Sequence, residues 1–471
     1  MSLSLAFVII TQFLIGLGVV TRLRAVTNGY SLLGLAMLVG LGVSSALPFG
    51  LAFAHLPIAP TPMLIGLGVW AALSLILLRN QSTYLRKVFA PNRLSVRLCE
   101  LPFVAFWGYL LFISAWKCAW FPVTPFDMQV GPDLVATFAV REQTLASSVF
   151  TEHLPSVSVL SNQPFYAPFT AMQQVIYLLA VDSTGPFAFG KVWLTVLVVA
   201  FGLFFYAELR ERIHPLLAGL LLTLLACTPE LFAYTFLVQT DWANAAFLAS
   251  GVLLFQRYLD SAQRGSLMGS VLMLALACWT RTETIFFVLP GALLVFINRI
   301  RSSPAVGLIQ SAGLFLACLV PVLFWNYGFL RGCVPLPPQI HLGQLHDVAG
   351  NHLQHLVAIF AGMNKQVVFN ANHWSYAVPI FLLLTTLNLV VFRDKNGLPV
   401  LIWLLSIYLL FGLLIQYVDG ANIPYTFRRG FFKLLFLMYI YLSNTTLFDW
   451  LSVRLYQWEG RPAASLSTPQ P

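Results

Sequence analysis

Residues 3–21 read LSLAFVIITQFLIGLGVVT, an almost wholly apolar run that is followed directly by Arg22 and Arg24. A helix needs about 17 to 25 predominantly apolar residues to cross the hydrocarbon layer of a bilayer, and this run has that length. It lacks the basic leading region and the small-residue cleavage site of a secretory signal. We therefore expect it to remain in the protein as a membrane-spanning helix.

Comparable runs recur along the whole chain, in which 59% of the residues are hydrophobic and 9% are charged. With a mean hydropathy of +0.81, the chain has more apolar surface than a water-soluble globule buries. The sequence predicts an all-α polytopic membrane protein, a helical bundle with about thirteen spans. The predicted spans are residues 3–21, 30–54, 62–78, 100–120, 188–207, 216–228, 241–258, 267–279, 284–298, 304–326, 376–392, 398–416 and 431–449.

Lysine and arginine residues gather in every second connection between these spans, which the positive-inside rule makes the cytoplasmic side. Three longer connections, residues 121–186, 327–376 and 417–430, then lie on the outer, non-cytoplasmic face. The net charge of +9 reflects this topology, because the basic residues form no stripe with interleaved aromatic residues. We therefore expect membrane lipids, and not nucleic acid, as partners.

The basic stretch at residues 79–99 indicates a domain boundary. It separates a three-helix extension, residues 1–99, from a larger transmembrane module, residues 100–450, and a cytoplasmic tail, residues 451–471. The six cysteines show no CxxC spacing, so neither a disulfide framework nor a zinc knuckle is predicted.

Two carboxylates in the first outer connection are candidate general bases. Prolines and a glycine surround Asp127 and indicate a turn that holds its carboxylate just above the bilayer, with Asp133 as the competing candidate. The alternative for both is an ordinary loop or helix-capping aspartate. Further along, residues 164–181 mix apolar and amide side chains at helical spacing, as in a helix lying at the membrane interface; a further span is the alternative.

Charged residues at the other outer turns are candidate substrate ligands, because ionisable groups at a membrane need partners or water. Asp241 opens a predicted span, where helix capping is the alternative role. Arg281 and Glu283 share a tight turn and can form a structural ion pair. The adjacent Arg428 and Arg429, with Tyr425 nearby, present the planar, forked donors that suit a phosphate. Anchoring to lipid headgroups is the alternative for this pair.

His352 and His355 are an i, i+3 pair in the second outer connection. They can line a polar pocket, or they can bind a metal, although no ligand signature such as HExxH accompanies them. The sequence also contains no Walker loop, no GxSxG elbow and no dinucleotide fingerprint. We therefore expect no cofactor and no metal.

This order of parts resembles the GT-C class of integral-membrane glycosyltransferases, which includes the mannosyl and aminoarabinose transferase-like families. The resemblance covers about residues 100–450. Its elements are an acidic residue in the first outer loop (Asp127), a proline- and tyrosine-containing segment before an interfacial helix (Gln163 to Pro168, with Tyr166), an aspartate at a short outer turn (Asp241), and an Arg-x-Glu turn (Arg281 to Glu283). Met128 follows Asp127 where several members have a second acidic residue, and three extra helices precede the module.

The resemblance implies that the chain transfers a hexosyl or pentosyl group, with inversion, from a polyprenyl-phosphate carrier to a lipid or glycan acceptor. Asp127 or Asp133 would be the base. Arg428, Arg429 and Arg281 would bind the donor phosphate. The implied substrate-binding residues are Asp241, Glu283, Tyr166, Tyr425, His352 and His355.

Two other functions remain open from the sequence. A polysaccharide polymerase or ligase also uses lipid-linked glycans and outer-face arginines. A lipid or solute transporter would place ionisable residues at mid-bilayer, whereas the predicted spans carry little charge apart from Lys117 and Lys191 near their outer ends.

Overall fold

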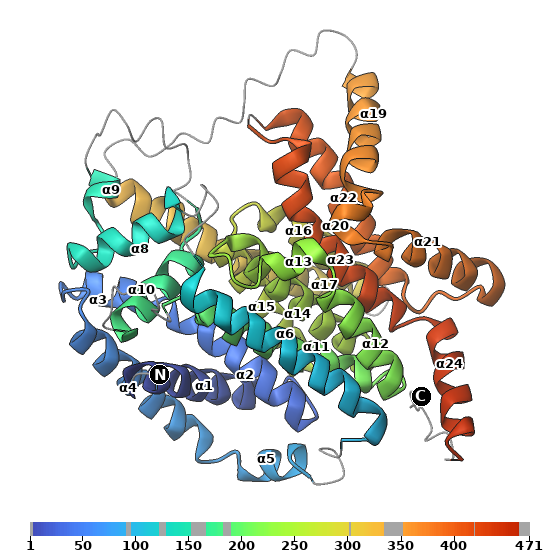
Figure 1. Ribbon diagram of the computed structural model, residues 1–471, viewed down its shortest axis with the longest axis horizontal. Helices are drawn as coiled ribbons and strands as arrows, with labels where there is room; N and C mark the ends of the chain where they lie inside the picture. The colour runs from blue at the N-terminus through green and yellow to red at the C-terminus, as the bar shows by residue number, and fades with distance from the viewer. Residues whose placement is uncertain are drawn as a thin grey trace.

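The computed structural model describes residues 3–90, 96–121, 129–151, 166–181, 190–300, 303–333, 352–418 and 420–460, and throughout these ranges the regular structure is helical (Figure 1). The main helices are α1 (Leu3–Leu23), α2 (Gly29–Ser44), α3 (Leu47–Phe53), α4 (Pro60–Leu78), α5 (Ser82–Val88), α6 (Leu101–Trp120), α8 (Pro132–Arg141), α9 (Ser148–Thr151), α10 (Phe169–Val181), α11 (Trp193–Arg210), α12 (Pro215–Ala226), α13 (Pro229–Ala233), α14 (Thr240–Ser261), α15 (Arg264–Thr280), α16 (Thr284–Ile300), α17 (Pro304–Leu323), α19 (His352–Met363), α20 (Ala371–Trp374), α21 (Ala377–Leu387), α22 (Leu398–Tyr417), α23 (Arg428–Leu442) and α24 (Thr446–Trp458).

Within the described ranges, 7 helices are long and apolar enough to cross a membrane, or 8 if the pair Ile423–Leu442 and Thr446–Trp458, bent by 55°, forms one span. The chain is therefore an all-helical, multi-pass membrane protein. The 7 helices are α1, α2 with α3, α4, α6, α11, α17 with the π-helical turn after it, and α22. The other predicted spans fall on α14 and on the shorter apolar helices α12, α15, α16 and α21, so the number thirteen stays a prediction.

Close helix contacts attach the N-terminal helices to the rest of the bundle. A Cβ atom at Gly16 of α1 would lie 1.7 Å from the carbonyl oxygen of Ala36 in α2, so the two backbones touch. Gly34 of α2 also packs closely on α11, where a Cβ atom would lie 2.6 Å from the carbonyl oxygen of Ala200. Small residues allow this approach, which is how helices associate in lipid. Residues 3–90 thus share a core with the larger module.

Polar contacts join the same helices near the end of α11. Glu208, which is fully buried, accepts hydrogen bonds from Arg257 of α14 (2.8 Å) and from the hydroxyl of Ser31 in α2 (2.8 Å). Glu211 accepts from the side chain of Asn28 (2.6 Å) and also contacts Arg257. Buried carboxylates need such partners, so residues of the N-terminal helices complete an ion network of α11 and α14.

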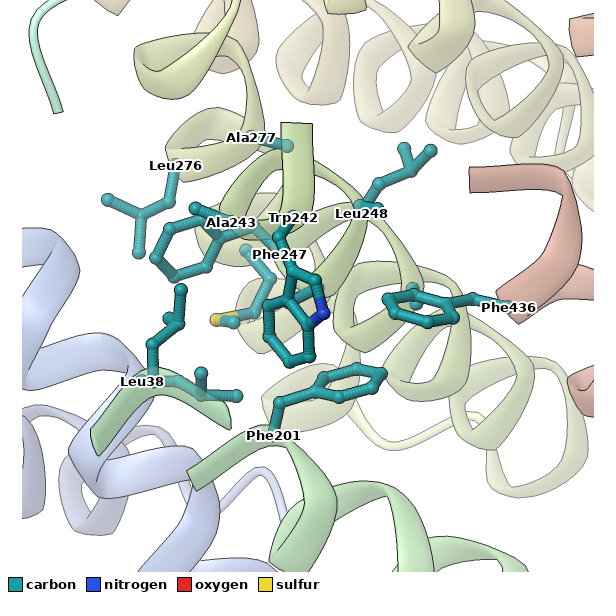
Figure 2. Packing of buried hydrophobic residues seen from close by; sticks show 14 of the residues in the cluster. Leu38, Phe201, Trp242, Ala243, Phe247, Leu248, Leu276, Ala277 and Phe436 are labelled. Atoms are coloured by element: carbon teal, nitrogen blue, oxygen red, sulfur yellow. The ribbon is translucent and has the colours of Figure 1, made fainter. Parts of the chain in front are cut away.

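Helix α14 lies at the centre of the bundle, and nearly every residue from its start to Tyr258 is buried. Figure 2 shows Trp242 of α14 beside Phe201 of α11 and Phe436 of α23. The rings of Phe201 and Phe436 stack with centroids 4.8 Å apart, and Trp242 meets Phe201 edge-on at 5.5 Å. This aromatic core fixes the first turn of α14, and with it the neighbouring Asp241.

The predicted helix at residues 164–181 is present as α10, but it is buried among other helices. Its amide side chains bond inside the protein: Gln173 accepts from Gln12 of α1 (3.1 Å), and Gln174 accepts from the indole of Trp193 (2.8 Å). The pattern of apolar and amide residues therefore reflects packing within the protein, where the sequence alone indicated contact with the membrane interface.

Candidate active site

Asp241 is the centre of a cluster of charged side chains. It lies in the first turn of α14 and is 1% exposed. Its Oδ1 contacts Nη1 of Arg281, and its Oδ2 lies 3.9 Å from Nη1 of Arg429. The N-cap residue of α14 is Gln239, so Asp241 is not the capping residue and its carboxylate contacts the arginines instead.

Arg281 is held by carboxylates on two sides. It ends α15 in an extended conformation, and its Nε contacts Oε1 of Glu283, so the ion pair expected from the sequence is present. Its guanidinium carbon also lies 5.7 Å from the ring centroid of Tyr166, at a distance suited to a cation–π contact. The structure therefore brings Asp241, Arg281, Glu283 and Tyr166 together.

Arg428 and Arg429, which are adjacent at the start of α23, contact different carboxylates. Arg429 faces Asp241, and its Nε donates to the backbone carbonyl of Tyr425 (3.3 Å). Arg428 instead pairs with Glu230 (3.3 Å), whose other carboxylate oxygen lies 3.6 Å from Nδ1 of His373. The two arginines thus extend the charged region over two adjacent carboxylates.

Lys433 belongs to the cluster, although the sequence analysis gave it no role. It lies one turn beyond Arg429 on α23 and is 1% exposed. Its Nζ lies 5.6 Å from the ring centroid of Phe287 and 5.9 Å from that of Phe411, and it forms no ion pair with a described carboxylate. The i, i+4 spacing of Arg429 and Lys433 on a helix was the signal that could have revealed it.

Among the residues that the structure describes, the cluster holds more cations than carboxylates. Arg281, Arg429 and Lys433 face the carboxylates of Asp241 and Glu283, and Lys433 forms no ion pair with either of them. A buried charge without a counter-ion is unfavourable, particularly in a membrane protein. The arrangement can therefore bind an anionic group.

Asp133 lies on α8, apart from this cluster in its contacts. Gln174 of α10 donates to its Oδ1 (3.1 Å), and no ion pair joins it to an arginine in the part of the chain that the structure describes. Burial raises the pKa of Asp133, while the charge of Lys191 and the hydrogen bond from Gln174 oppose that rise. Asp127 lies outside the described residues.

The remaining predicted site residues do not touch the cluster with their side chains. Tyr425 is 60% exposed and contributes its backbone carbonyl to Arg429. His352 and His355 are exposed at the start of α19, where the backbone carbonyl of His352 accepts from Gln416 (3.2 Å). Among the residues described, no group of three His, Cys, Asp or Glu side chains is placed to hold a metal ion.

Comparison with known proteins adds one match. Residues 165–325 match the model of the family described as dolichyl-phosphate-mannose-protein mannosyltransferase. The matched segment includes Tyr166, Asp241, Arg281 and Glu283. No curated protein and no solved structure matches the chain. Over this segment the chain is similar to the dolichyl-phosphate-mannose-protein mannosyltransferase family, whose description names a sugar donor carried on a lipid phosphate.

Proposed function

We propose that the protein is a membrane glycosyltransferase, which moves a hexosyl or pentosyl group from a polyprenyl-phosphate carrier to a lipid or glycan acceptor at the outer face of the membrane. The observation that carries the proposal is the cluster around Asp241, where three cations face two carboxylates. The positive-inside pattern of the connecting loops supports the outward orientation.

The donor phosphate is the anion that the cluster would bind. Arg281 and Arg429 supply forked donors, and Lys433 supplies a compact charge in an aromatic, water-poor environment. Asp241 lies in the first turn of α14, so the positive end of that helix dipole adds to the attraction. Arg428, already paired with Glu230, would assist from the edge of the cluster.

The reaction would be a single displacement. A carboxylate base takes the proton from an acceptor hydroxyl or amine, whose oxygen or nitrogen then attacks the anomeric carbon of the sugar. The bond between that carbon and the phosphate oxygen breaks, the configuration inverts, and the lipid phosphate leaves with its negative charge stabilised by the cations. Asp127 is the proposed base, with Asp133 as the competing candidate.

Other residues would position the two substrates. Asp241 and Glu283 orient Arg281 and can accept hydrogen bonds from sugar hydroxyls, while Tyr166 covers the guanidinium. Tyr425, His352 and His355 remain proposed ligands from the outer connections.

The direct test is a transfer assay on the purified protein in lipid nanodiscs. Radiolabelled polyprenyl-phosphate sugars are supplied with extracted membrane lipids, and wild type is compared with Asp127→Asn and Asp133→Asn. We expect transfer by the wild type and a loss of at least about 100-fold in one variant, as for removal of a general base. Transfer from no donor would contradict the proposed reaction, and full activity in both variants would exclude both bases.

A further inference from the structure

A separate cavity uses none of the residues of the Asp241 cluster. Its volume is about 550 Å³, it is open on one side, and it is bordered by the end of α1, the linker to α2, helix α5 and the start of α15. Figure 1 shows α5 at the foot of the bundle, on the side where α4 ends. The lining residues are Leu23, Arg24, Val26, Thr27, Thr83, Tyr84, Lys87, Val88, Gln263, Arg264 and Gly265.

Direct contacts between the enclosing segments fix the frame of the cavity. Tyr84 of α5 donates to the carbonyl oxygen of Val26 (2.7 Å), and Ser266 of α15 donates to that of Ala25 (3.2 Å). A Cβ atom at Gly265 would lie 2.2 Å from the carbonyl oxygen of Leu23, so α15 begins directly on the end of α1. The cavity is therefore built by three segments that hold one another in place.

The charge of the lining is entirely positive. Arg24, Lys87 and Arg264 come from three separate segments, and no carboxylate is among the lining residues. None of the three forms an ion pair with any residue that the structure describes. The carboxylate of Glu211 accepts a hydrogen bond from the lining residue Thr27 (3.0 Å), and it shares Arg257 with Glu208.

Further donors accompany these cations. Thr83 and Gln263 line the same space, and the positive end of the α15 dipole lies there because its first residues form part of the wall. Such a combination suits a phosphate ester. The loops involved belong to the side predicted to be cytoplasmic, where membranes present anionic lipids and where basic pockets between helices bind lipid headgroups.

We propose that this cavity binds the phosphate headgroup of an anionic phospholipid from the cytoplasmic leaflet. Lys87 and Arg264 would flank the phosphodiester, Arg24 would approach from the end of α1, and the acyl chains would extend along the apolar surface of the helices. Bound lipid would then hold α5 and the N-terminal helices against α15.

The test uses the full chain without any sugar donor, so its outcome does not depend on the proposed reaction. Native mass spectrometry would count phosphatidylglycerol and phosphatidylcholine molecules retained by wild type, by Lys87→Gln/Arg264→Gln, and by Arg86→Gln. Arg86 is the control, because it is the exposed neighbour of Lys87 on α5 and does not line the cavity. We expect the double variant to lose retained phosphatidylglycerol by about fivefold for each cation removed, and the control to bind like wild type.

Thermal unfolding provides the second measurement. The protein is unfolded in phosphatidylcholine alone, with added phosphatidylglycerol, and with added inorganic phosphate. Phosphatidylglycerol should raise the Tm of the wild type and of Arg86→Gln, but not that of the double variant, and all three should share one Tm in phosphatidylcholine alone. Equal lipid retention by wild type and the double variant would overturn the site. Protection of the wild type by inorganic phosphate alone, matching that by phosphatidylglycerol, would overturn the lipid as its ligand.

Discussion

Asp241 and Arg429 face each other from two helices, with Oδ2 of the aspartate 3.9 Å from Nη1 of the arginine. A largely buried guanidinium is unfavourable without a counter-charge. The buried carboxylate of Asp241 supplies that charge. Positive charge thereby accumulates at one place in the bundle, where an arriving anion would complete the balance.

Asp241→Asn should destabilise the protein. Arg281 and Arg429 would lose their shared carboxylate while remaining largely buried, and breaking a buried ion pair in this way costs about 3 to 5 kcal/mol. Chemical denaturation in detergent micelles measures the change. Asp260→Asn, at the exposed end of the same helix, is the control and should unfold like wild type. If Asp241→Asn were as stable as Asp260→Asn, the structural role of Asp241 would be contradicted.

Lys433→Met should separate stability from activity. The apolar side chain fits between Phe287 and Phe411 and removes a buried charge that has no carboxylate partner, so we expect an unchanged or higher Tm. Transfer should fall by about 100-fold, because the leaving phosphate loses a cation. Lys365→Met, at an exposed lysine, should leave both quantities unchanged. An active Lys433→Met enzyme would remove Lys433 from the phosphate site.

Arg429→Gln should impair the enzyme more than Arg428→Gln. Arg429 is directed at the buried Asp241, whereas Arg428 pairs with Glu230 and keeps 30% of its side chain exposed. We expect at least about a tenfold larger loss of kcat/KM for the lipid-linked donor in Arg429→Gln, or about 1.4 kcal/mol of transition-state stabilisation. Equal losses would mean that the two arginines act as one unit.

The pH dependence of transfer can decide between the two candidate bases. Burial raises the pKa of Asp133, and a base must be deprotonated to act, so an Asp133-dependent rate falls as the pH decreases through that raised pKa. If Asp133 is the base, the acid limb of the rate profile lies above the pH expected for an ordinary aspartate, and Asp133→Asn abolishes the limb together with the rate. An acid limb that persists in Asp133→Asn assigns it to another group.

Gly16→Ala should weaken the contact between α1 and α2. The added Cβ atom would lie 1.7 Å from the carbonyl oxygen of Ala36, so the helices must move apart, at a cost of about 1 to 3 kcal/mol. Gly108→Ala in α6 is the matched control, because a Cβ atom there meets nothing within 4 Å. In thermal unfolding, the Tm of Gly16→Ala should be lower than that of Gly108→Ala.

The helical, membrane-spanning nature of the chain could be predicted because apolar runs of spanning length are a property of the sequence itself. The pairing of residues that are distant in the sequence could not be predicted. The sequence indicates Asp241, Arg281 and Glu283 as candidate site residues from their own local turns. The separate partners of Arg428 and Arg429 depend on how α13 and α23 pack. Lys433 was passed over because a single lysine at the start of an apolar run resembles an interfacial anchor.

The same limit applies to α10. Its alternation of amide and apolar residues fits a membrane surface as well as a protein interior, and its tertiary partners decide between them. Gln12 and Trp193, which bond its amides, lie in helices distant in sequence, and no local pattern indicates them.

The hydrogen bonds from Ser31 and Asn28 to Glu208 and Glu211 have a practical consequence for anyone who would trim the enzyme. A shortened version starting near residue 100 would deprive these carboxylates of their hydrogen bonds from the N-terminal helices, with Arg257 as their chief remaining partner. The leading helices are thus an integral wall of the bundle, and a minimal version of this transferase has to include them.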